Sequence, residues 1–217
     1  MDRRAFGASL AALVGAASRA RAAPLAGRAT LLVQTEWAAL RRLAARPPSA
    51  ERSRRVVARI GAWFDFPTRV VAMNVPPPTL TQAAALAYAL EMQLGLSWLA
   101  TGLELARHPF ELRGEVGSNG GVRVEAWVTP LKDVSTDVDF LVQSRPDLQI
   151  CEVHFDHTSP ARTAIRRAED GIRTLGWLQH LVALDAQIAK LRAQLGGGAP
   201  PASPPPPPTP AMLRRWG

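Results

Sequence analysis

The best candidates for catalytic or metal chemistry are His154, Asp156 and His157, at the end of a segment that alternates like a β-strand. Imidazole and carboxylate groups can exchange protons with a substrate or bind a metal ion. On a strand His154 and Asp156 share one face, whereas His157 lies past the last pleat. His154 and Asp156 could therefore bind the same metal ion, whereas His157 is not positioned to act as a third ligand. We predict a polar strand end, and keep an acid–base or metal site as the alternative.

The opposite face of the same strand is apolar. Cys151, Val153 and Phe155 share it, with Gln149 leading in. The single cysteine excludes an internal disulfide and any cysteine-based zinc site. The chain has no serine in a nucleophile elbow, no catalytic set emerges, and we expect no cofactor and no bound metal. We predict that the apolar face walls a hydrophobic interior.

Three further strands are predicted before this one, at residues 110–116, 122–128 and 134–143. A glycine-rich segment at 117–121 joins the first two, and because no helix follows it we predict a plain hairpin turn and not a phosphate-binding loop. On the first strand the alternation puts Val116 with the apolar set and Glu115 with the polar set. On the other two strands the residues predicted to face the interior are Val122, Val124, Ala126, Val128, Val138, Phe140 and Val142.

Helical periodicity precedes and follows these strands, at about residues 25–45, 49–60, 64–73 and 81–107, and again from Pro160 with a break at Gly176. The fourth helix is apolar over most of its circumference, which predicts a central helix. Part of its surface is a candidate cavity lining, through Leu90, Leu94 and Trp98. Gly95 and Gly102 within it predict close packing or a bend. Helices, four antiparallel strands and a final helix indicate an α+β domain, with helices on the concave face of a curved sheet.

Residues 1–22 have the organisation of an export signal. An Arg3-Arg4 pair precedes a moderately apolar run, and Ala20-Arg21-Ala22 is an Ala-x-Ala cleavage pattern. The apolar run is too short to span a bilayer as a helix. We predict export through the twin-arginine route and a mature protein that begins near Ala23 and works in the periplasm.

The remaining chain divides into a domain at residues 23–196 and a proline-rich tail at 197–217, which predicts an extended segment without a core. The formal charge of +8 overstates the basicity of the domain. Residues 1–22 hold four arginines and one aspartate, so 22 basic and 17 acidic residues remain, a net charge of +5. Aromatic and basic residues are not interleaved, and we expect no nucleic-acid binding. Scattered arginines favour solvated helix faces, with attraction to anionic lipid headgroups as the alternative.

Two short motifs complete the sequence evidence. Phe64-Asp65-Phe66 begins the third helical segment, and Glu152-Val153-His154-Phe155-Asp156-His157-Thr158-Ser159 ends the last strand. The order of the predicted elements and these two motifs resemble the MlaC family, the periplasmic phospholipid-binding proteins of the Mla (toluene-tolerance) lipid transport system. The resemblance covers about residues 25–195 and keeps both acidic positions and the serine. It departs at Met73-Asn74, where the family has leucine-glycine, and at His157, where the family has glycine.

Membership would imply an NTF2-like, cone-shaped fold whose apolar cavity holds the acyl chains of a phospholipid, or a hopanoid-like lipid, and leaves the headgroup outside. It would also imply a non-catalytic shuttle in outer-membrane lipid asymmetry. Its partners would be an inner-membrane ABC transporter complex and an outer-membrane lipoprotein complex, with transient contact to a membrane surface. The predicted cavity lining is then the set of inward strand residues together with Cys151, Val153, Phe155, Leu90, Leu94 and Trp98.

Two other classes of function stay open. A small enzyme on a similar fold could use Asp156 or His154 as a base, which requires these side chains to point into the cavity. An envelope adaptor could instead act through the proline-rich tail at residues 197–217.

Overall fold

The computed structural model describes residues 27–118, 120–131, 134–144 and 147–195. The predicted export signal and the predicted tail lie outside these residues. In chain order the elements are α2 (Arg28–Ala44), α3 (Ala50–Gly61), α4 (Phe66–Val71), α5 (Leu80–Ser97), α6 (Leu99–Leu105), β1 (Phe110–Ser118), β2 (Gly121–Leu131), β3 (Val134–Ser144), β4 (Leu148–Phe155), α7 (Pro160–Leu175) and α8 (Trp177–Gln194). In the described part, no helix is both long enough and apolar enough to cross a membrane.

The helices begin at side chains that accept the first free amides. The Ser49 hydroxyl accepts a hydrogen bond from the Arg52 amide at 3.1 Å, which confirms the predicted start of α3. Thr79 and Gln82 form a reciprocal capping box at the start of α5. The Asp65 carboxylate accepts from the Thr68 amide at 3.3 Å and starts α4 inside the Phe-Asp-Phe motif. Local sequence therefore sets the starts of these helices.

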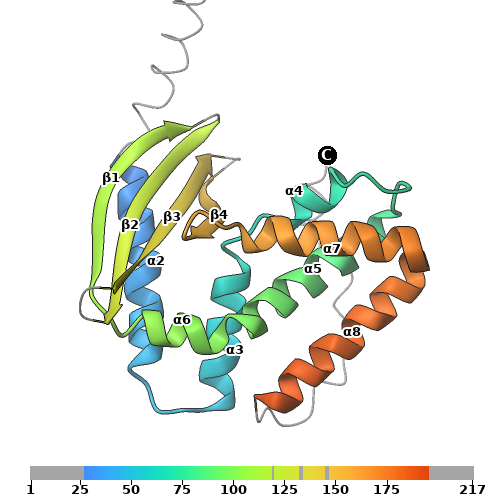
Figure 1. The fold of residues 1–217 in the computed structure, drawn as a ribbon, viewed down its shortest axis with the longest axis horizontal. Coiled ribbons are helices and arrows are strands. Elements are labelled where there is room, and N and C mark those ends of the chain that lie inside the picture. Colours follow the sequence, from blue (N-terminus) through green and yellow to red (C-terminus); the bar gives the residue numbers. More distant parts are fainter. Residues whose placement is uncertain (1–26, 119, 132–133, 145–146, 196–217) are drawn as a thin grey trace, which may run out of the picture.

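The four strands form one antiparallel sheet in the order β1-β2-β3-β4. Figure 1 shows a curved sheet with α2 lying along it and with the other helices gathered to one side. α2 contacts β2 and β4, and α6 contacts β2, so these two helices cover the inner face of the sheet. The predicted α+β class with a curved four-stranded sheet is confirmed.

A β-bulge in β1 changes the faces predicted for its second half. Leu112 pairs with Ala126 and Gly114 with Glu125, so Arg113 is an extra residue in the register. Beyond the bulge Glu115 pairs with the buried Val124, and Val116 is 43% exposed. The predicted placement of Val116 inward and Glu115 outward is wrong because the bulge reverses the alternation.

The predicted long helix is two helices that meet at Trp98. At this residue φ is −99° and ψ is 2°, and α6 continues from the next residue. The predicted close packing of the two helical glycines is also present. A Cβ at Gly95 would lie 2.4 Å from the Val57 carbonyl oxygen, and one at Gly102 would lie 2.6 Å from Ile60 Cδ1. Glycine at these positions lets α3 approach both α5 and α6.

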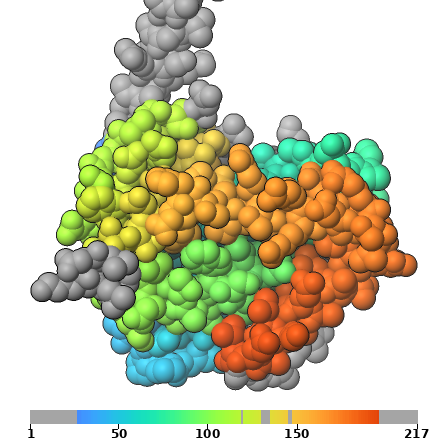
Figure 2. Space-filling view, viewed as in Figure 1, coloured from blue at the N-terminus to red at the C-terminus, as the bar shows by residue number. Residues whose placement is uncertain are grey.

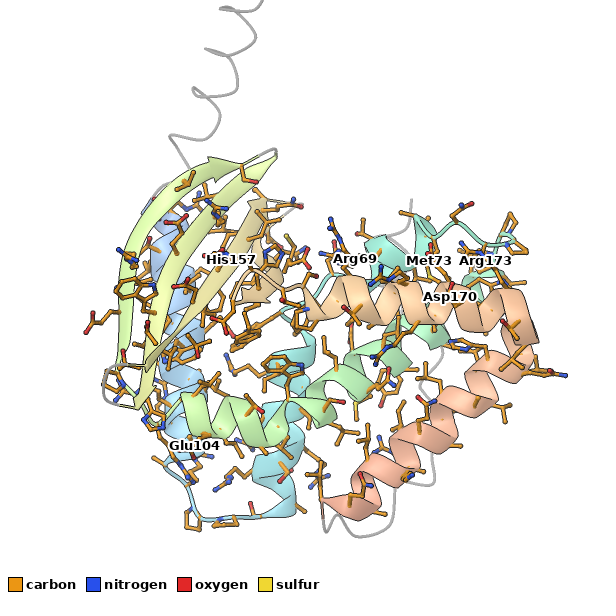
Figure 3. The ribbon with its side chains drawn as sticks, in the orientation of Figure 1. Arg69, Met73, Glu104, His157, Asp170 and Arg173 are labelled. Carbon is orange, nitrogen blue, oxygen red and sulfur yellow. The ribbon has the colours of Figure 1, made fainter. Side chains whose placement is uncertain are left out.

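The last two helices and α4 form the other side of the molecule. α8 packs on α5, and α7 contacts α4, α5 and β4. Figure 2 shows the side chains of α7 running across this face, between the sheet and α8. The segment after α4 is held against α7, since the Asn74 amide donates to Glu169 Oε1 at 2.8 Å and Arg173 donates to the Asn74 carbonyl at 2.8 Å. Figure 3 shows Met73, Asp170 and Arg173 gathered there.

Candidate functional site

Across β2, β3 and β4 the inner face of the sheet is a continuous apolar surface, whereas β1 contributes Glu115 to this face. Val124 on β2, Phe140 on β3 and Val153 on β4 lie in one row across three strands. A parallel row joins Ala126, Val138 and Phe155. Of the thirteen side chains predicted to line a cavity, eleven are buried. These are Val122, Val124, Ala126, Val128, Val138, Phe140, Val142, Cys151, Val153, Leu90 and Leu94.

A second bulge adds a residue that sequence alternation missed. Leu141 pairs with Glu152 and Val142 with Ile150, so Cys151 is the extra residue of β4. Ile150, and not Gln149, thereby shares the register of Val142 on the inner face. The Cys151 thiol donates to the Leu141 carbonyl at 3.3 Å and is buried. The alternating apolar pattern does not reveal a bulge, so the sequence did not indicate that Ile150 faces inward.

Aromatic rings fill the space between α2 and the sheet. The Trp37 ring stacks on Phe110 with centroids 4.5 Å apart, and Phe140 lies edge-on to Trp37 at 6.3 Å. Trp63, from the end of α3, meets Phe140 edge-on at 5.9 Å. We call Trp37, Trp63, Phe110 and Phe140 the aromatic cluster. The inner face is therefore packed against side chains, and Val124, Val138, Phe140 and Val153 have no exposed surface.

The two remaining predicted residues, Trp98 and Phe155, are partly exposed. Their rings stack with centroids 4.2 Å apart and with an angle of 21° between the planes. The contact joins the α5–α6 junction to the end of β4. Leu90 and Leu94 lie within α5, which ends just before Trp98, and are buried where α5 packs, mainly on α3, α4, α7 and α8. The structure thus brings Trp98 to the sheet and keeps Leu90 and Leu94 among helices.

The acidic face of β4 is a structural network. The Glu152 carboxylate, 8% exposed as a residue, accepts hydrogen bonds from Arg69 of α4 and from the Ser159 hydroxyl. Ser159 also caps α7 by accepting from the Arg162 amide at 2.9 Å. These partners satisfy the hydrogen-bonding capacity of the buried carboxylate. Glu152 therefore ties α4, β4 and the start of α7 together.

The histidines and the aspartate at the strand end do not form a catalytic or metal set. His154 lies in register with Asp139, on the face opposite Val153, and its Nε2 is 3.6 Å from Glu152 Oε1. The Asp156 carboxylate accepts from the Asp137 amide at 3.0 Å. His157 is exposed, with Nε2 3.7 Å from Asp137. Among the described residues no group of three His, Cys, Asp or Glu side chains is placed to hold a metal.

The turn after β4 explains the departure at His157. Asp156 and His157 have φ of 46° and 62°, and Phe155 and Thr158 exchange backbone hydrogen bonds of 3.0 and 2.9 Å around them. Two central residues with positive φ are typical of a tight type I′ turn. Aspartate and histidine enter this region more readily than most residues. His157 thus adopts a backbone conformation that glycine adopts freely.

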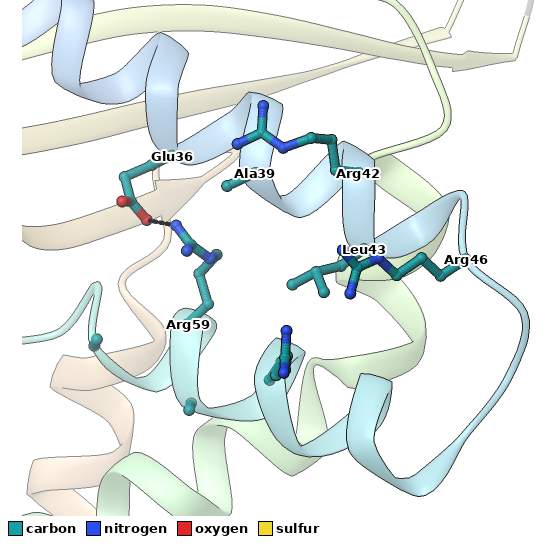
Figure 4. A pocket seen from close by; sticks show the side chains of 9 residues that line it. Glu36, Ala39, Arg42, Leu43, Arg46 and Arg59 are labelled. Atoms are coloured by element: carbon teal, nitrogen blue, oxygen red, sulfur yellow. Dashed lines mark hydrogen bonds and ion pairs between the residues drawn. The ribbon is translucent and has the colours of Figure 1, made fainter.

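Two hollows open on the surface of the helices around α2. One, of about 530 Å³, lies between α2 and α3 (Figure 4). The other, of about 320 Å³, lies between α2 and β1 and reaches Trp37 and Phe110 of the aromatic cluster. Trp98 and Phe155 line neither hollow. The α2–β1 hollow therefore borders the aromatic cluster. The Trp98–Phe155 contact lies elsewhere, at the end of β4.

Comparison with known proteins shows a likeness to a solved structure. No protein-family model matches the chain, and no curated protein matches it. Among solved structures, the chain is similar to a phospholipid-binding protein from Ralstonia solanacearum, solved in complex with a phospholipid. The TM-score is 0.60 at 14% sequence identity, over 75% of this chain and 95% of that one. At this identity the likeness establishes a shared fold.

Proposed function

We propose that this chain binds a lipid and holds its acyl chains against the inner face of the sheet. The observation that carries the proposal is the shared fold with a phospholipid-binding protein, which extends over 95% of that protein. The inner face supports it independently, because its rows from Val124 to Val153 offer only apolar side chains. Membership of the MlaC family, as a divergent member, is part of the same proposal.

The energetics of lipid transfer favour such a surface. Burial of one CH₂ group contributes about 0.8 kcal/mol, so two acyl chains with about thirty such groups represent on the order of 25 kcal/mol. A carrier that removes a lipid from a bilayer must recover nearly all of this free energy by burying the acyl chains in its own apolar interior. An unpaired polar group in contact with the acyl chains would reduce the free energy gained on binding. The Val-rich rows of β2, β3 and β4 meet that requirement.

Acyl chains need space that the aromatic cluster now fills. A lipid can reach Phe140 and Val153 only if α2 or its aromatic side chains move away from the sheet. We place the entry at Trp98 and Phe155, because they are the partly exposed members of the predicted lining. Separating one stacked pair costs less than breaking the aromatic cluster, since each such contact contributes about 1 kcal/mol.

The finer proposal concerns cellular role. A periplasmic shuttle would exchange lipid, phospholipid or hopanoid-like, between an inner-membrane ABC transporter complex and an outer-membrane lipoprotein complex. The predicted twin-arginine signal supports the location, and the absence of catalytic activity is proposed with it. The enzyme alternative requires Asp156 or His154 to point into the cavity. His154 lies on the face away from Val153, and the Asp156 carboxylate accepts from the Asp137 amide. The adaptor alternative depends on residues 197–217, outside the described structure.

The test is to purify the full chain from the periplasm of a Gram-negative host and to examine it by native mass spectrometry and lipid extraction. We expect a co-purifying lipid. Val124→Arg should abolish loading, because it places a charge in the middle of the inner face. Val116→Arg, the same change at an exposed position, should load normally. Absence of lipid from the purified chain, together with no uptake from labelled vesicles, would refute the proposal.

A milder variant protects this test against misfolding. Phe155→Arg lies at the partly exposed edge of the inner face, where the guanidinium can reach water. We expect it to fold, as judged by circular dichroism, and to load less lipid than Val116→Arg. Equal lipid loading of Phe155→Arg and Val116→Arg would show that the end of β4 is not part of the lipid-binding surface.

A further inference from the structure

The α2–α3 hollow is lined by arginines from three consecutive parts of the chain. Arg42 extends from α2, Arg46 from the loop, and Arg55 and Arg59 from α3. Glu36 is the one carboxylate in the lining, so the lining carries four positive charges and one negative charge. Figure 4 shows Arg42, Arg46 and Arg59 around the opening. The rest of the lining is Ala39, Leu43, Ala58 and Ala62.

Two of the four arginines, Arg55 and Arg59, are paired with a carboxylate. Arg59 Nη1 lies 2.6 Å from Glu36 Oε2, and Arg55 Nε lies 2.7 Å from Glu51 Oε1. Within the described part of the chain, Arg42 and Arg46 have no carboxylate partner within ion-pair distance. Like charges that share a concave surface raise the local positive potential. An anion in the hollow would relieve this repulsion.

The loop that borders the hollow is fixed by a hydrogen bond and by two prolines. Arg52 Nη1 donates to the Arg46 carbonyl at 2.6 Å, and the two prolines that follow Arg46 restrict the loop. The three alanines of the lining leave room between the helices, consistent with the volume of about 530 Å³. The guanidinium groups therefore surround a preformed space large enough for a phosphate ester.

We propose that this hollow binds a phosphate-bearing anion, either the headgroup of an anionic phospholipid at a membrane surface or a soluble phosphate compound. Guanidinium groups bind phosphate oxygens in a bidentate manner, which suits Arg42 and Arg46. The site is separate from the inner face of the sheet, because its lining comes only from α2, α3 and the residues that follow each helix. It does not depend on lipid being carried inside the protein.

The hollow is coupled to the aromatic cluster through one carboxylate. Glu36 Oε2, which binds Arg59, also accepts from Trp63 Nε1 at 3.3 Å. An anion that attracts Arg59 would alter the environment of the Trp63 indole N–H. That proton provides a local reporter, assigned by its loss in Trp63→Phe.

The experiment uses the mature full chain and two kinds of probe. Soluble probes are inorganic phosphate and glycerol 3-phosphate, followed by calorimetry and by the Trp63 indole resonance. Membrane probes are phosphatidylcholine vesicles with and without phosphatidylglycerol, followed by co-sedimentation. We expect binding to at least one phosphate probe, with a shift of the Trp63 resonance. Binding to the soluble probes alone identifies a free anion, and binding to phosphatidylglycerol vesicles identifies a headgroup; both support the site.

Matched variants separate a built site from net charge. Arg42→Gln with Arg46→Gln should weaken binding by about tenfold or more, the effect of one charge-assisted hydrogen bond. Arg42→Lys with Arg46→Lys should recover only part of the affinity, because lysine cannot bind in a bidentate manner. Arg166→Gln with Arg167→Gln, an equal charge loss on exposed positions of α7, should change binding little. Equal losses in the two glutamine variants, or no binding to any phosphate probe, would overturn the proposal.

Discussion

Both carboxylate oxygens of Glu115 lie 2.9 Å from the backbone nitrogen of Gly27, across 88 residues of chain. Glu115 Oε1 also accepts from the Thr30 amide at 3.0 Å and from the Thr30 hydroxyl. Gly27 is the N-cap of α2 and supplies no capping side chain of its own. A residue of β1 therefore caps α2, the helix that covers the sheet. The negative charge of Glu115 at the N-terminus of α2 also interacts favourably with the helix dipole.

This cap predicts a pH-dependent contribution to stability. Burial raises the pKa of the Glu115 carboxyl, but the hydrogen bonds from Thr30 and Gly27 outweigh it and hold the pKa below the ordinary value of 4.5. A lowered pKa in the folded state stabilises the fold above about pH 4.5, and this contribution is lost as the pH falls through the folded-state pKa. Glu115→Gln should lower the free energy of unfolding by about 1 kcal/mol at pH 7 and by less at pH 4.

Urea unfolding at the two pH values measures this difference. Glu111→Gln is the matched control, because Glu111 is exposed on the same strand and makes no described side-chain hydrogen bond. An equal loss at pH 7 and pH 4 for Glu115→Gln would show that the carboxylate charge does not contribute to the cap.

The position of Glu115 depends on a feature that the local sequence of β1 does not encode. Alternation predicted β1 as a strand and its first half correctly, with Phe110 and Leu112 packed against the core. It misplaced Glu115 because the bulge at Arg113 shifts every later side chain to the other face. Arg113 lies 3.4 Å from the Trp127 ring centroid, a cross-strand contact consistent with the bulged position. Such a contact depends on which strands pair, and that information is not local to β1.

A second prediction concerns the buried ion pair of Arg69 and Glu152. The Arg69 side chain is 26% exposed and that of Glu152 is 10% exposed. Arg69→Ala would leave a desolvated carboxylate with Ser159 as its remaining side-chain hydrogen-bond donor. The expected loss in the free energy of unfolding is about 3 kcal/mol, measured by chemical denaturation. Arg54→Ala, which removes one of the two exposed arginine partners of Glu51, should change stability little. Similar small effects of both changes would contradict a buried network.

A third prediction tests the contact between α3 and α5. Gly95→Ala would place a Cβ 2.4 Å from the Val57 carbonyl oxygen, so one of the helices must shift. We expect a loss of about 2 kcal/mol in the free energy of unfolding. Gly114→Ala is the control, because its added Cβ meets no atom within 4 Å. If Gly95→Ala unfolds at the same denaturant concentration as Gly114→Ala, the helices are not in the close contact described.

For the candidate site, the sequence predicted most of the strand residues that share the inner face, missed Ile150, and did not predict which side chains pack against them. The period of two places Val124, Val138 and Val153 inward whatever covers them. The presence of Trp37 and Trp63 opposite Phe140 follows from how α2 and α3 dock on the sheet. Trp37 is a buried residue of α2, and the helical period of residues 25–45 does not specify which side chains it contacts. Tertiary packing of this kind has no signature in local periodicity.

The last prediction concerns the contact between Trp98 and Phe155, and it rests on the proposed lipid binding. If this pair closes the entry, Trp98→Leu should speed the uptake of fluorescent phospholipid from vesicles. Removal of a stacking contact worth about 1 kcal/mol lowers the barrier to opening, which corresponds to roughly a fivefold increase in rate. Stopped-flow fluorescence measures the rate, and the amount of lipid bound at equilibrium should change less than the rate.

The control for entry fills the hollow between α2 and β1, which borders the aromatic cluster. Leu112 lines the hollow between α2 and β1, and Leu112→Trp should fill much of its volume of about 320 Å³. With entry at Trp98 and Phe155, this variant takes up lipid at the normal rate. Slower uptake in Leu112→Trp with an unchanged rate in Trp98→Leu would instead locate the entry at β1. The lipid would then reach Phe110 and Trp37 before any other part of the aromatic cluster, because both line that hollow.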